Sequence, residues 1–180
     1  FCTELFMDRI YDSSKRHFNL FFDNAWNSLV EMDSYGHDVE AGWLLCEAAR
    51  VLEDRQLMDR ANRLALDVTD ACLAEGLSDK GYMMYEKKGG RTTGHASWWG
   101  QIETMIACVN AWQISGNDVY LQSADTVWTF VKDCMIDREY GEWYSDCFDG
   151  EPKKDTPKVS MWRCPYHTVR LGVEIHNRLK

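Results

Sequence analysis

Proline is scarce in this chain. The chain also lacks an excess of positive charge and long hydrophobic runs. Only 3 of the 180 residues are proline, which favours helices because proline interrupts a helix interior. Asp and Glu number 29 against 20 Lys and Arg, a net charge of -9. This balance argues against partners such as a nucleic-acid backbone or an anionic membrane, which attract clustered basic residues. No stretch is apolar for long enough to cross a membrane, and no signal-peptide pattern opens the chain.

Paired cysteines are missing as well. The 7 cysteines are an odd number and form no C-x-x-C motif. Cys46, Cys108 and Cys134 lie in apolar stripes at helical spacing. We interpret them as small buried hydrophobic residues of a reducing compartment, and therefore expect a cytoplasmic location.

The residues that are present describe a globular chain. Hydrophobic residues make up 45% and charged residues 27%, as in an ordinary soluble domain and unlike a disordered chain. By length alone the chain suggests one domain with a real core. The 8 tryptophans indicate either a heavy core or an aromatic-lined pocket.

Apolar residues recur at helical spacing through most of the sequence. The pattern predicts helices over residues 38–53, 57–76, 98–114, 119–135 and 163–179. We expect the first segment, residues 2–26, to be helical too. Two short aromatic stretches, residues 81–86 and 141–146, are predicted to be extended.

The order of these elements repeats. An offset of 63 places Glu40 on Glu103, and Ala61 on Ala124. Each unit is a helical hairpin followed by a short extended loop. Such hairpins bury their faces only by stacking, either as an open solenoid or as a closed α/α ring. Amphipathic helices with aromatic residues at both ends favour the ring, so we predict an all-α toroid with a polar mouth.

The first cluster with chemical potential surrounds His37. Gly36 breaks the chain and Ser34 or Asp38 can cap the following helix, so His37 lies at a helix N-terminus, where the helix dipole disfavours imidazolium. Glu40 lies three residues on, on the same face, and can orient the ring. His37 could instead merely help to cap the helix. The H-x-x-E spacing is not that of the H-E-x-x-H zinc helix, and no further cluster completes a metal site, so we expect no metal.

The second cluster is the run Ser97-Trp98-Trp99-Gly100-Gln101-Ile102-Glu103. Neighbours on a helix point about 100° apart, so Trp98 and Trp99 cannot both face the core. We expect one of them to face the hydrophobic interface and the other the mouth of the ring, where an indole can stack on the C–H face of a sugar. Glu103 is the repeat partner of Glu40, so both should approach the same central cavity. Core aromatics and a solvated Glu103 are the alternative.

The third cluster, residues 161–167, straddles the start of the last predicted helix. Junctions of this kind expose backbone groups and side chains at one end of a helical barrel. His167 could therefore be a second acid/base group, with Trp162 nearby. His17 and His176 lie in otherwise ordinary helical patterns.

Four runs together resemble the N-acylglucosamine 2-epimerase family, and most of all its cellobiose or mannobiose 2-epimerases. They are G-H-D-V-E-A-G-W, W-W-G-Q-I-E, G-E-W-Y and W-R-C-P-Y-H. The resemblance implies an (α/α)6 barrel and a cofactor-independent isomerase acting at C2 of a reducing-end sugar. Carried over residue by residue, His37 and His167 match the catalytic histidines and Glu40 the carboxylate beside the first. Trp162 and Trp98 or Trp99 match aromatics that hold the sugar.

We also assign Tyr35 and Glu103 to substrate binding. The chain departs from the family pattern at Gly100, where proline is common, and at Arg163, where lysine is usual. Family members are about twice as long, so residues 1–180 are expected to form the C-terminal half of the barrel. The other half would supply an arginine and a further histidine, and we expect the isolated chain to be inactive. A second copy could cover its exposed edge as a homodimer.

Three alternatives remain at this point. The same scaffold could epimerise an N-acylhexosamine or interconvert an aldose and a ketose. A glycoside hydrolase on an α/α toroid would use two carboxylates, here Glu40 and Glu103. A helical-repeat interaction module would have no activity.

Overall fold

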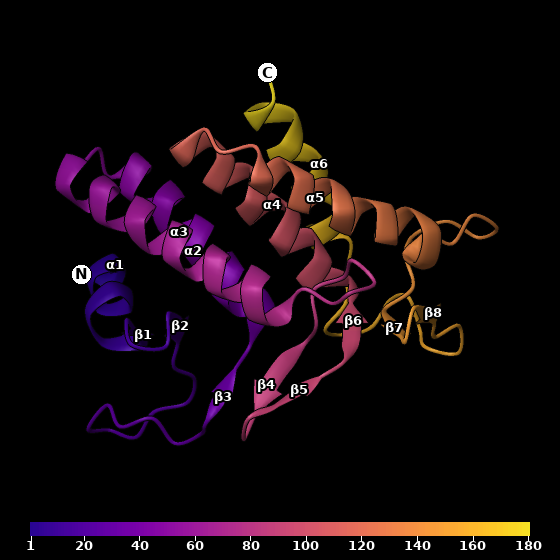
Figure 1. Cartoon of the computed structure of the whole chain (residues 1–180), viewed down its shortest axis with the longest axis horizontal. Coiled ribbons are helices and arrows are strands. Elements are labelled where there is room, and N and C mark those ends of the chain that lie inside the picture. The colour runs from indigo at the N-terminus through magenta and orange to yellow at the C-terminus, as the bar shows by residue number, and fades with distance from the viewer.

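Two long helical hairpins form the body of the protein in the computed structural model, which describes residues 1–180 (Figure 1). The first pairs α2 (Tyr35–Val51) with α3 (Arg55–Gly76). The second pairs α4 (Trp98–Ser115) with α5 (Val119–Phe130), which continues as a π-helical segment, Val131–Met135. The last helix is α6 (Tyr166–Arg178). The five helices predicted from apolar spacing are confirmed.

Two of the predicted starts were wrong by about one turn. Helix α2 begins at Tyr35 rather than residue 38, because Ser34 is its extended N-cap residue. Helix α6 begins at Tyr166 rather than residue 163. Pro165 is its N-cap residue, since proline has no N–H to donate and suits the very start of a helix.

The N-terminal segment departs most from expectation. Helix α1 (Cys2–Leu5) and a π-helical turn, Phe6–Ile10, are followed by a hairpin of β1 (Tyr11–Asp12) and β2 (His17–Phe18) and then by a loop. Asp12 accepts hydrogen bonds from the backbone of Ser14 and Lys15, and Arg16 adopts a positive φ of 62°. This Asx-turn joins β1 to β2, because the side chain offers the backbone an alternative to helical bonding. The helical segment itself ends earlier, at Ile10.

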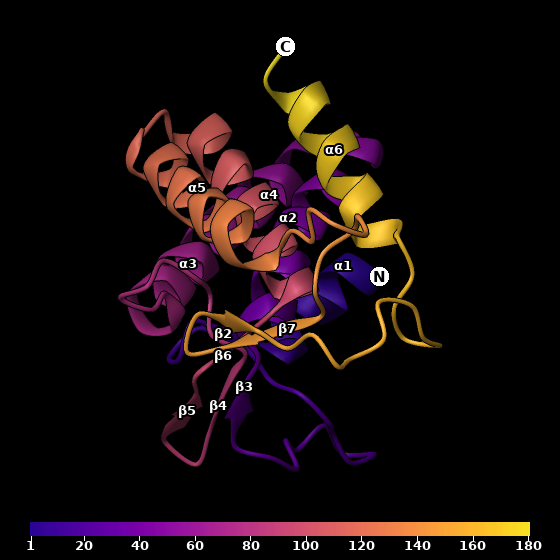
Figure 2. The ribbon, with the colours of Figure 1, turned by 90° about the vertical axis from the view of Figure 1, so that its right-hand side faces the viewer.

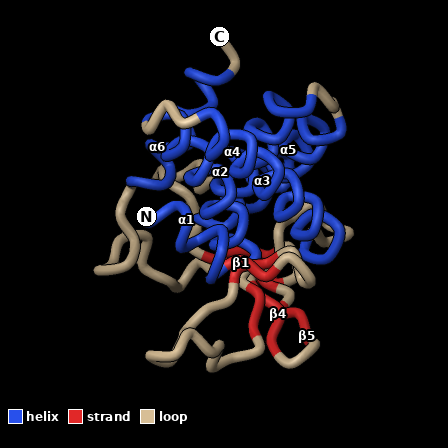
Figure 3. Tube along the Cα trace, turned by 90° about the vertical axis from the view of Figure 1, so that its left-hand side faces the viewer, coloured by secondary structure: helices blue, strands red, loops and turns tan.

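Short strands gather at one end of the helices (Figure 3). One antiparallel sheet joins β3 (Met32–Asp33), β4 (Glu86–Lys88) and β5 (Arg91–Thr93). The other joins β6 (His95–Ser97), β7 (Asp146–Phe148) and β8 (Glu151–Pro152). Strand β3 leads into α2 through Ser34, and β6 leads directly into α4. The first turns of both helices are therefore fixed beside the strands.

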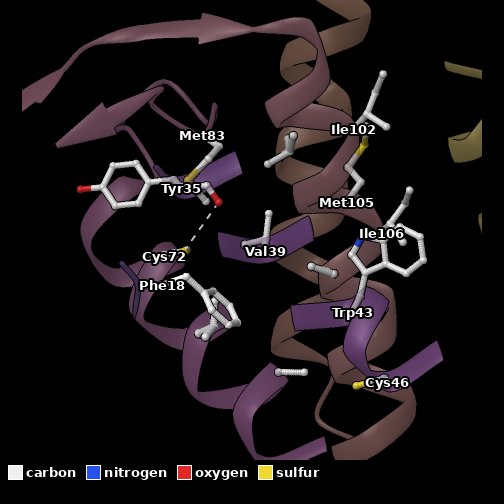
Figure 4. Packing of buried hydrophobic residues seen from close by; sticks show 14 of the residues in the cluster. Phe18, Tyr35, Val39, Trp43, Cys46, Cys72, Met83, Ile102, Met105 and Ile106 are labelled. Atoms are coloured by element: carbon white, nitrogen blue, oxygen red, sulfur yellow. Dashed lines mark hydrogen bonds between the residues drawn. The ribbon is translucent and has the colours of Figure 1, made fainter. Parts of the chain in front are cut away.

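The core lies between α2, α3 and α4 (Figure 4). Val39, Val68, Ile102 and Ile106 have at most 1% of their surface exposed, and each such side chain contributes about 1.5–3 kcal/mol through burial. Of the three cysteines predicted to be buried, Cys46 and Cys108 are buried, whereas Cys134 is only half-buried. All seven cysteines are free.

Helix α4 is central, since it packs against α2, α3, α5 and α6. Figure 2 shows α6 beside α4, with α3 and α5 on the other side. Helices α2, α4 and α6 thus follow one another along one layer, with α3 and α5 forming a second. This alternation is the arc of an α/α ring. No helix combines the length and apolar character that a membrane span needs.

Candidate active site

His37 lies at the exposed mouth of the site. It is the third residue of α2, and its Nδ1 atom is 2.8 Å from the hydroxyl oxygen of the N-cap residue Ser34. The serine hydroxyl therefore holds the imidazole and makes no capping bond to the backbone. The imidazole Nε2 atom is left to face the solvent side. The spacing predicted that Glu40 would orient His37. In the structure Glu40 accepts a hydrogen bond from Arg170 instead.

Trp99 lies between the two histidines. Its ring centroid is 4.6 Å from that of His37 and 5.9 Å from that of His167. Gly36 makes room for it, since a Cβ atom there would stand 2.6 Å from the indole. Trp98 is turned toward the Arg163 guanidinium, 4.9 Å away, and its ring lies 6.3 Å from His167. Both indoles are half-buried, consistent with a role at a mouth rather than in the core.

Glu103 is fully buried and holds three donors. Its carboxylate accepts hydrogen bonds from Trp43 Nε1 at 2.9 Å, His167 Nδ1 at 2.6 Å and Arg170 Nη1 at 3.0 Å. The assignment of Glu103 to direct sugar contact is therefore corrected, because its surface is 0% exposed. It orients His167, which is the part that Glu40 was expected to play for His37. With Nδ1 bound to a carboxylate, His167 has Nε2 available for proton transfer.

Arg170 is a member of this cluster that the sequence motifs did not predict. Its Nη1 atom donates to Glu40 at 2.6 Å and to Glu103 at 3.0 Å. Burial alone would lower the pKa of Arg170, but the hydrogen bond to Glu40 and the charges of both glutamates raise it above its ordinary value. Its position three residues after His167, on the same face of α6, was the available signal. Glu40 and Glu103 thus share a partner, but only Glu40 lines a cavity, since Glu103 is fully buried.

Arg163 fixes the loop beneath the tryptophans. It is only 3% exposed and donates to the Ser145 hydroxyl at 2.8 Å and to the Trp143 carbonyl. Burial lowers its pKa. Lysine at this position could not make both bonds in the same fork geometry, so the departure from the family pattern has a structural consequence here.

Two predicted sugar contacts lie away from the site. Tyr35 is 0% exposed and packs in the core with Met83, near the Cys72 thiol (Figure 4). It cannot touch a ligand in this arrangement, because the first residue of α2 faces inward. Trp162 is 83% exposed in the loop before α6, so its indole is packed against neither histidine.

Two groups of side chains have the donor types of a metal site. In the first, atoms of Glu40, Glu103 and His167 lie within 4.8 Å of one another. Arg170 already binds both carboxylates there, and its positive charge opposes a cation. In the second, His17, Asp38 and Cys72 are fully buried, and burial raises the pKa of the Cys72 thiol well above its ordinary value. Neither group favours a metal.

A cavity of about 800 Å³ opens beside His37. It lies between α1, the segment after β2 and the exposed side of α2. Most of its lining is hydrophobic, with Ser34, His37, Glu40 and Tyr85 at its polar end. His37 thus borders an open hollow that could admit a small molecule, whereas His167 does not line it.

The chain matches the family described as N-acylglucosamine 2-epimerase (GlcNAc 2-epimerase) over residues 2–170. It is 40% identical over 176 residues to a cellobiose 2-epimerase from Bacteroides fragilis, covering 95% of this chain and 44% of the relative. A sugar epimerase from a ruminal bacterium superposes with a TM-score of 0.94 at 34% identity, over 98% of this chain and 46% of that structure. The cellobiose 2-epimerase of Bacillus thermoamylovorans B4167 gives 0.91 at 33% identity, over 98% and 45%.

The chain therefore spans a little under half the length of the relatives that it matches. Its helices form about half of their (α/α)6 barrel, which settles the choice between a ring and an open solenoid in favour of the ring. The four sequence runs, the arc of helices and the match over residues 2–170 agree, and the chain belongs to the N-acylglucosamine 2-epimerase family.

Proposed function

We propose that this chain is the C-terminal half of a carbohydrate 2-epimerase, acting at C2 of the reducing-end sugar of a cellobiose- or mannobiose-type disaccharide. The carrying observation is the pair of imidazoles beside Trp99. Each has Nδ1 held, by Ser34 or by Glu103, and Nε2 left for chemistry. The names of the relatives support a disaccharide substrate.

Inversion at C2 of an aldose begins with ring opening. One imidazole then takes the C2 proton, the electrons of the broken C–H bond form a C1–C2 double bond, and the carbonyl oxygen becomes negatively charged. Return of a proton to the opposite face of C2 gives the epimer and restores the aldehyde. Imidazole suits both steps because it exchanges protons near neutral pH. We propose His37 and His167 as this pair, with no cofactor.

The buried carboxylate of Glu103 supports His167 as a base. It fixes the tautomer with the proton on Nδ1 and would stabilise the imidazolium that forms after proton uptake. Glu40 and Arg170 complete the network by holding α2 against α6. Trp99, between the histidines, is placed to stack on the sugar ring, and Trp98 and Trp162 are proposed as further sugar contacts.

The negative oxygen of the enediolate requires a donor. Arg170 is a weak candidate because Glu40 and Glu103 already neutralise it. We propose that the remaining half of the barrel supplies this donor, and with it a further histidine. The 180-residue chain alone would therefore lack part of the machinery.

Two rivals act through different chemistry or a different sugar. A hydrolase needs one carboxyl group to act as a general acid, whereas both Glu40 and Glu103 are tied to Arg170, which favours the epimerase. Epimerisation of an N-acylhexosamine, or proton return to C1 to give a ketose, would use the same histidines, and substrate comparison separates these reactions.

Product analysis with the full-length protein that carries this chain tests the proposal. Incubation with cellobiose should give its 2-epimer, whereas glucose release would indicate a hydrolase and a ketose an isomerase. His167→Asn should lower turnover by at least a thousandfold, in line with the loss of an acid/base group and its orientation, while leaving the helical circular dichroism unchanged. Replacement of the exposed His176 by Asn is the matched control. Near-normal turnover of His167→Asn would remove it from the mechanism.

A further inference from the structure

A second histidine–carboxylate pair lies beneath the first turn of α2. His17 of β2 and Asp38 of α2 are 2% and 0% exposed, and His17 Nδ1 is 2.8 Å from Asp38 Oδ2. The other oxygen of Asp38 accepts the backbone N–H of Phe18 at 2.9 Å. Both carboxylate oxygens are therefore bound to the β1–β2 hairpin, from the residue that directly follows His37.

Burial of His17 and Asp38 costs free energy that a hydrophobic pair would not, which suggests that the pair has a role beyond packing. Burial raises the pKa of Asp38, and its bond to His17 offsets part of that rise. Burial alone would lower the pKa of His17, but Asp38 raises it above its ordinary value. Burying charges is costly even when they are paired, and a hydrophobic contact of the same size would cost less. What the pair adds is a directed, two-oxygen attachment at one point of the helix.

That point matters for the geometry of His37. The Ser34 hydroxyl holds the imidazole at 2.8 Å, and the Ser34 carbonyl accepts the backbone N–H of Asp38 at 2.9 Å. Ser34, His37 and Asp38 thus form one closed turn. A shift of Asp38 would move the backbone of His37 and alter its distance to Trp99.

The Nε2 side of the His17 ring lies near charged groups. Its Nε2 atom has no hydrogen-bond partner and lies 3.6 Å from Glu75 Oε1. Glu75 in turn pairs with Lys87 of β4 at 2.7 Å. The negative charge of Asp33 also raises the pKa of His17. The hairpin, the end of α3 and the β3–β4 sheet therefore meet at this one imidazole.

We propose that His17 and Asp38 are positioning residues for His37: they fix the first turn of α2 so that the imidazole stays seated on Ser34 and beside Trp99. This inference rests on the proposed function for its kinetic consequence. Its structural consequence, a single conformation and tautomer of His37, does not depend on that function.

The test uses the full-length protein with four variants. Asp38→Asn removes the charge, and His17→Ala removes the donor. His17→Asn restores a donor near the position of Nδ1. The matched control is Tyr11→Phe, which removes the bond from the same hairpin to Asp67 of α3 at 3.0 Å and leaves α2 untouched. Turnover and KM are measured for each variant, together with the ring ¹⁵N shifts of selectively labelled His37.

Small misplacements of a reacting group can cost about a hundredfold in rate. We expect kcat to fall about 10- to 100-fold in Asp38→Asn and His17→Ala, with KM changed less than about threefold, since neither residue touches substrate. The ¹⁵N shifts of His37 should move toward a tautomer average in both. His17→Asn should recover most of the loss, and Tyr11→Phe should leave kcat and the shifts unchanged.

Unchanged kcat and unchanged His37 shifts in folded Asp38→Asn or His17→Ala would overturn the proposal, as would an equal fall in Tyr11→Phe. If Asp38→Asn does not fold, the comparison of His17→Ala with His17→Asn decides. A wild-type protein without epimerase activity would contradict the proposed function, while the His37 shifts would still test the positioning role.

Discussion

Glu103 of α4 organises the site at the level of single residues, because its one buried carboxylate accepts from three donors on two other helices. Trp43 comes from α2, whereas His167 and Arg170 come from α6. A charge buried this deeply is tolerated only where its partners are in place. Its value to the protein is therefore the fixed relation between α2, α4 and α6 at the point where His167 must be held.

The substitution Glu103→Gln tests this arrangement. The amide keeps the shape but removes the charge that His167 and Arg170 require, so we expect kcat to fall at least about a hundredfold, or about 3 kcal/mol. The melting temperature should fall as well, since Arg170 loses a charged partner.

The control for this substitution is Glu47→Gln. Glu47 also joins α2 to α6, through Arg178 at 2.6 Å, but lies away from the histidines. It should lower stability, because the pair is half-buried, with Arg178 8% and Glu47 25% exposed, and it should leave kcat within about twofold. Equal losses of kcat in both variants would contradict a special role of Glu103.

Asp137 predicts a pH dependence of stability. Its bond to Lys158, together with the backbone N–H groups of Glu139 and Tyr140, lowers its pKa to about 2. A lowered carboxyl pKa adds stability above the unfolded value of about 3.9, and that stability is lost as the pH falls through the folded value. The difference in melting temperature between wild type and Asp137→Asn should therefore be constant above about pH 5 and shrink between about pH 4 and 2.

A constant difference down to pH 2 would show that the charge of Asp137 contributes nothing. Asp125→Asn, on the exposed side of α5, is the control, and its difference from wild type should stay near zero throughout.

At the level of elements, apolar spacing predicted the helices because each buries one stripe against a neighbour. It failed at the N-terminus, where the helical segment ends at Ile10 and the chain continues as the β1–β2 hairpin, whose turn Asp12 stabilises. The exposure of Trp162 was not predicted either, since nothing in the spacing of its loop indicates that the indole is exposed.

The site was predicted in its members more than in its contacts. His37, His167 and Trp99 lie together as their motifs suggested. The partner of each carboxylate depends on which helices become neighbours, and this is set by the stacking of hairpins distant in sequence. Hence Glu103 orients a histidine where sugar contact was expected, Glu40 binds Arg170 rather than His37, and Arg170 was overlooked.

The contact between the first turns of α2 and α4 can be tested at Gly36. A Cβ atom there would stand 2.6 Å from Trp99 and 3.3 Å from the Gly100 Cα atom. Gly36→Ala must therefore displace the indole or separate the helices, at a cost of about 1–3 kcal/mol. Thermal unfolding should show this loss, and turnover should fall with it.

Gly172→Ala is the matched control, because a Cβ atom at Gly172 of α6 has nothing within 4 Å. It should leave stability equal or raise it by up to about 1 kcal/mol, since alanine favours a helix. A Gly36→Ala protein as stable and active as wild type would mean that the close approach of α2 and α4 is not required.

At the level of the whole molecule, an arc of helices exposes apolar surface at its two ends. Phe6, beside α1, is 39% exposed, and Val169 and Val173 of α6 are 60% and 50% exposed. In a ring these surfaces would be covered by further helices, and in a homodimer by a second copy. The cavity beside His37 opens at the α1 end, so closure of the ring would also complete the site.

The isolated 180-residue chain should therefore fold but not turn over sugar, because the proposed function assigns the donor for the enediolate oxygen and one side of the pocket to the rest of the barrel. Circular dichroism and an epimerisation assay on the isolated chain check this. Turnover by the chain alone, at a rate near that of the full-length protein, would contradict the half-barrel account of the site.

The fate of the C2 hydrogen is the most direct measure of the proposed proton transfer between His37 and His167. The full-length protein is incubated with cellobiose in D2O, and the epimer is examined by NMR. We predict one deuteron at C2 of the product and none at C1, with no incorporation in the His167→Asn protein. An epimer that retains hydrogen at C2 would contradict the account.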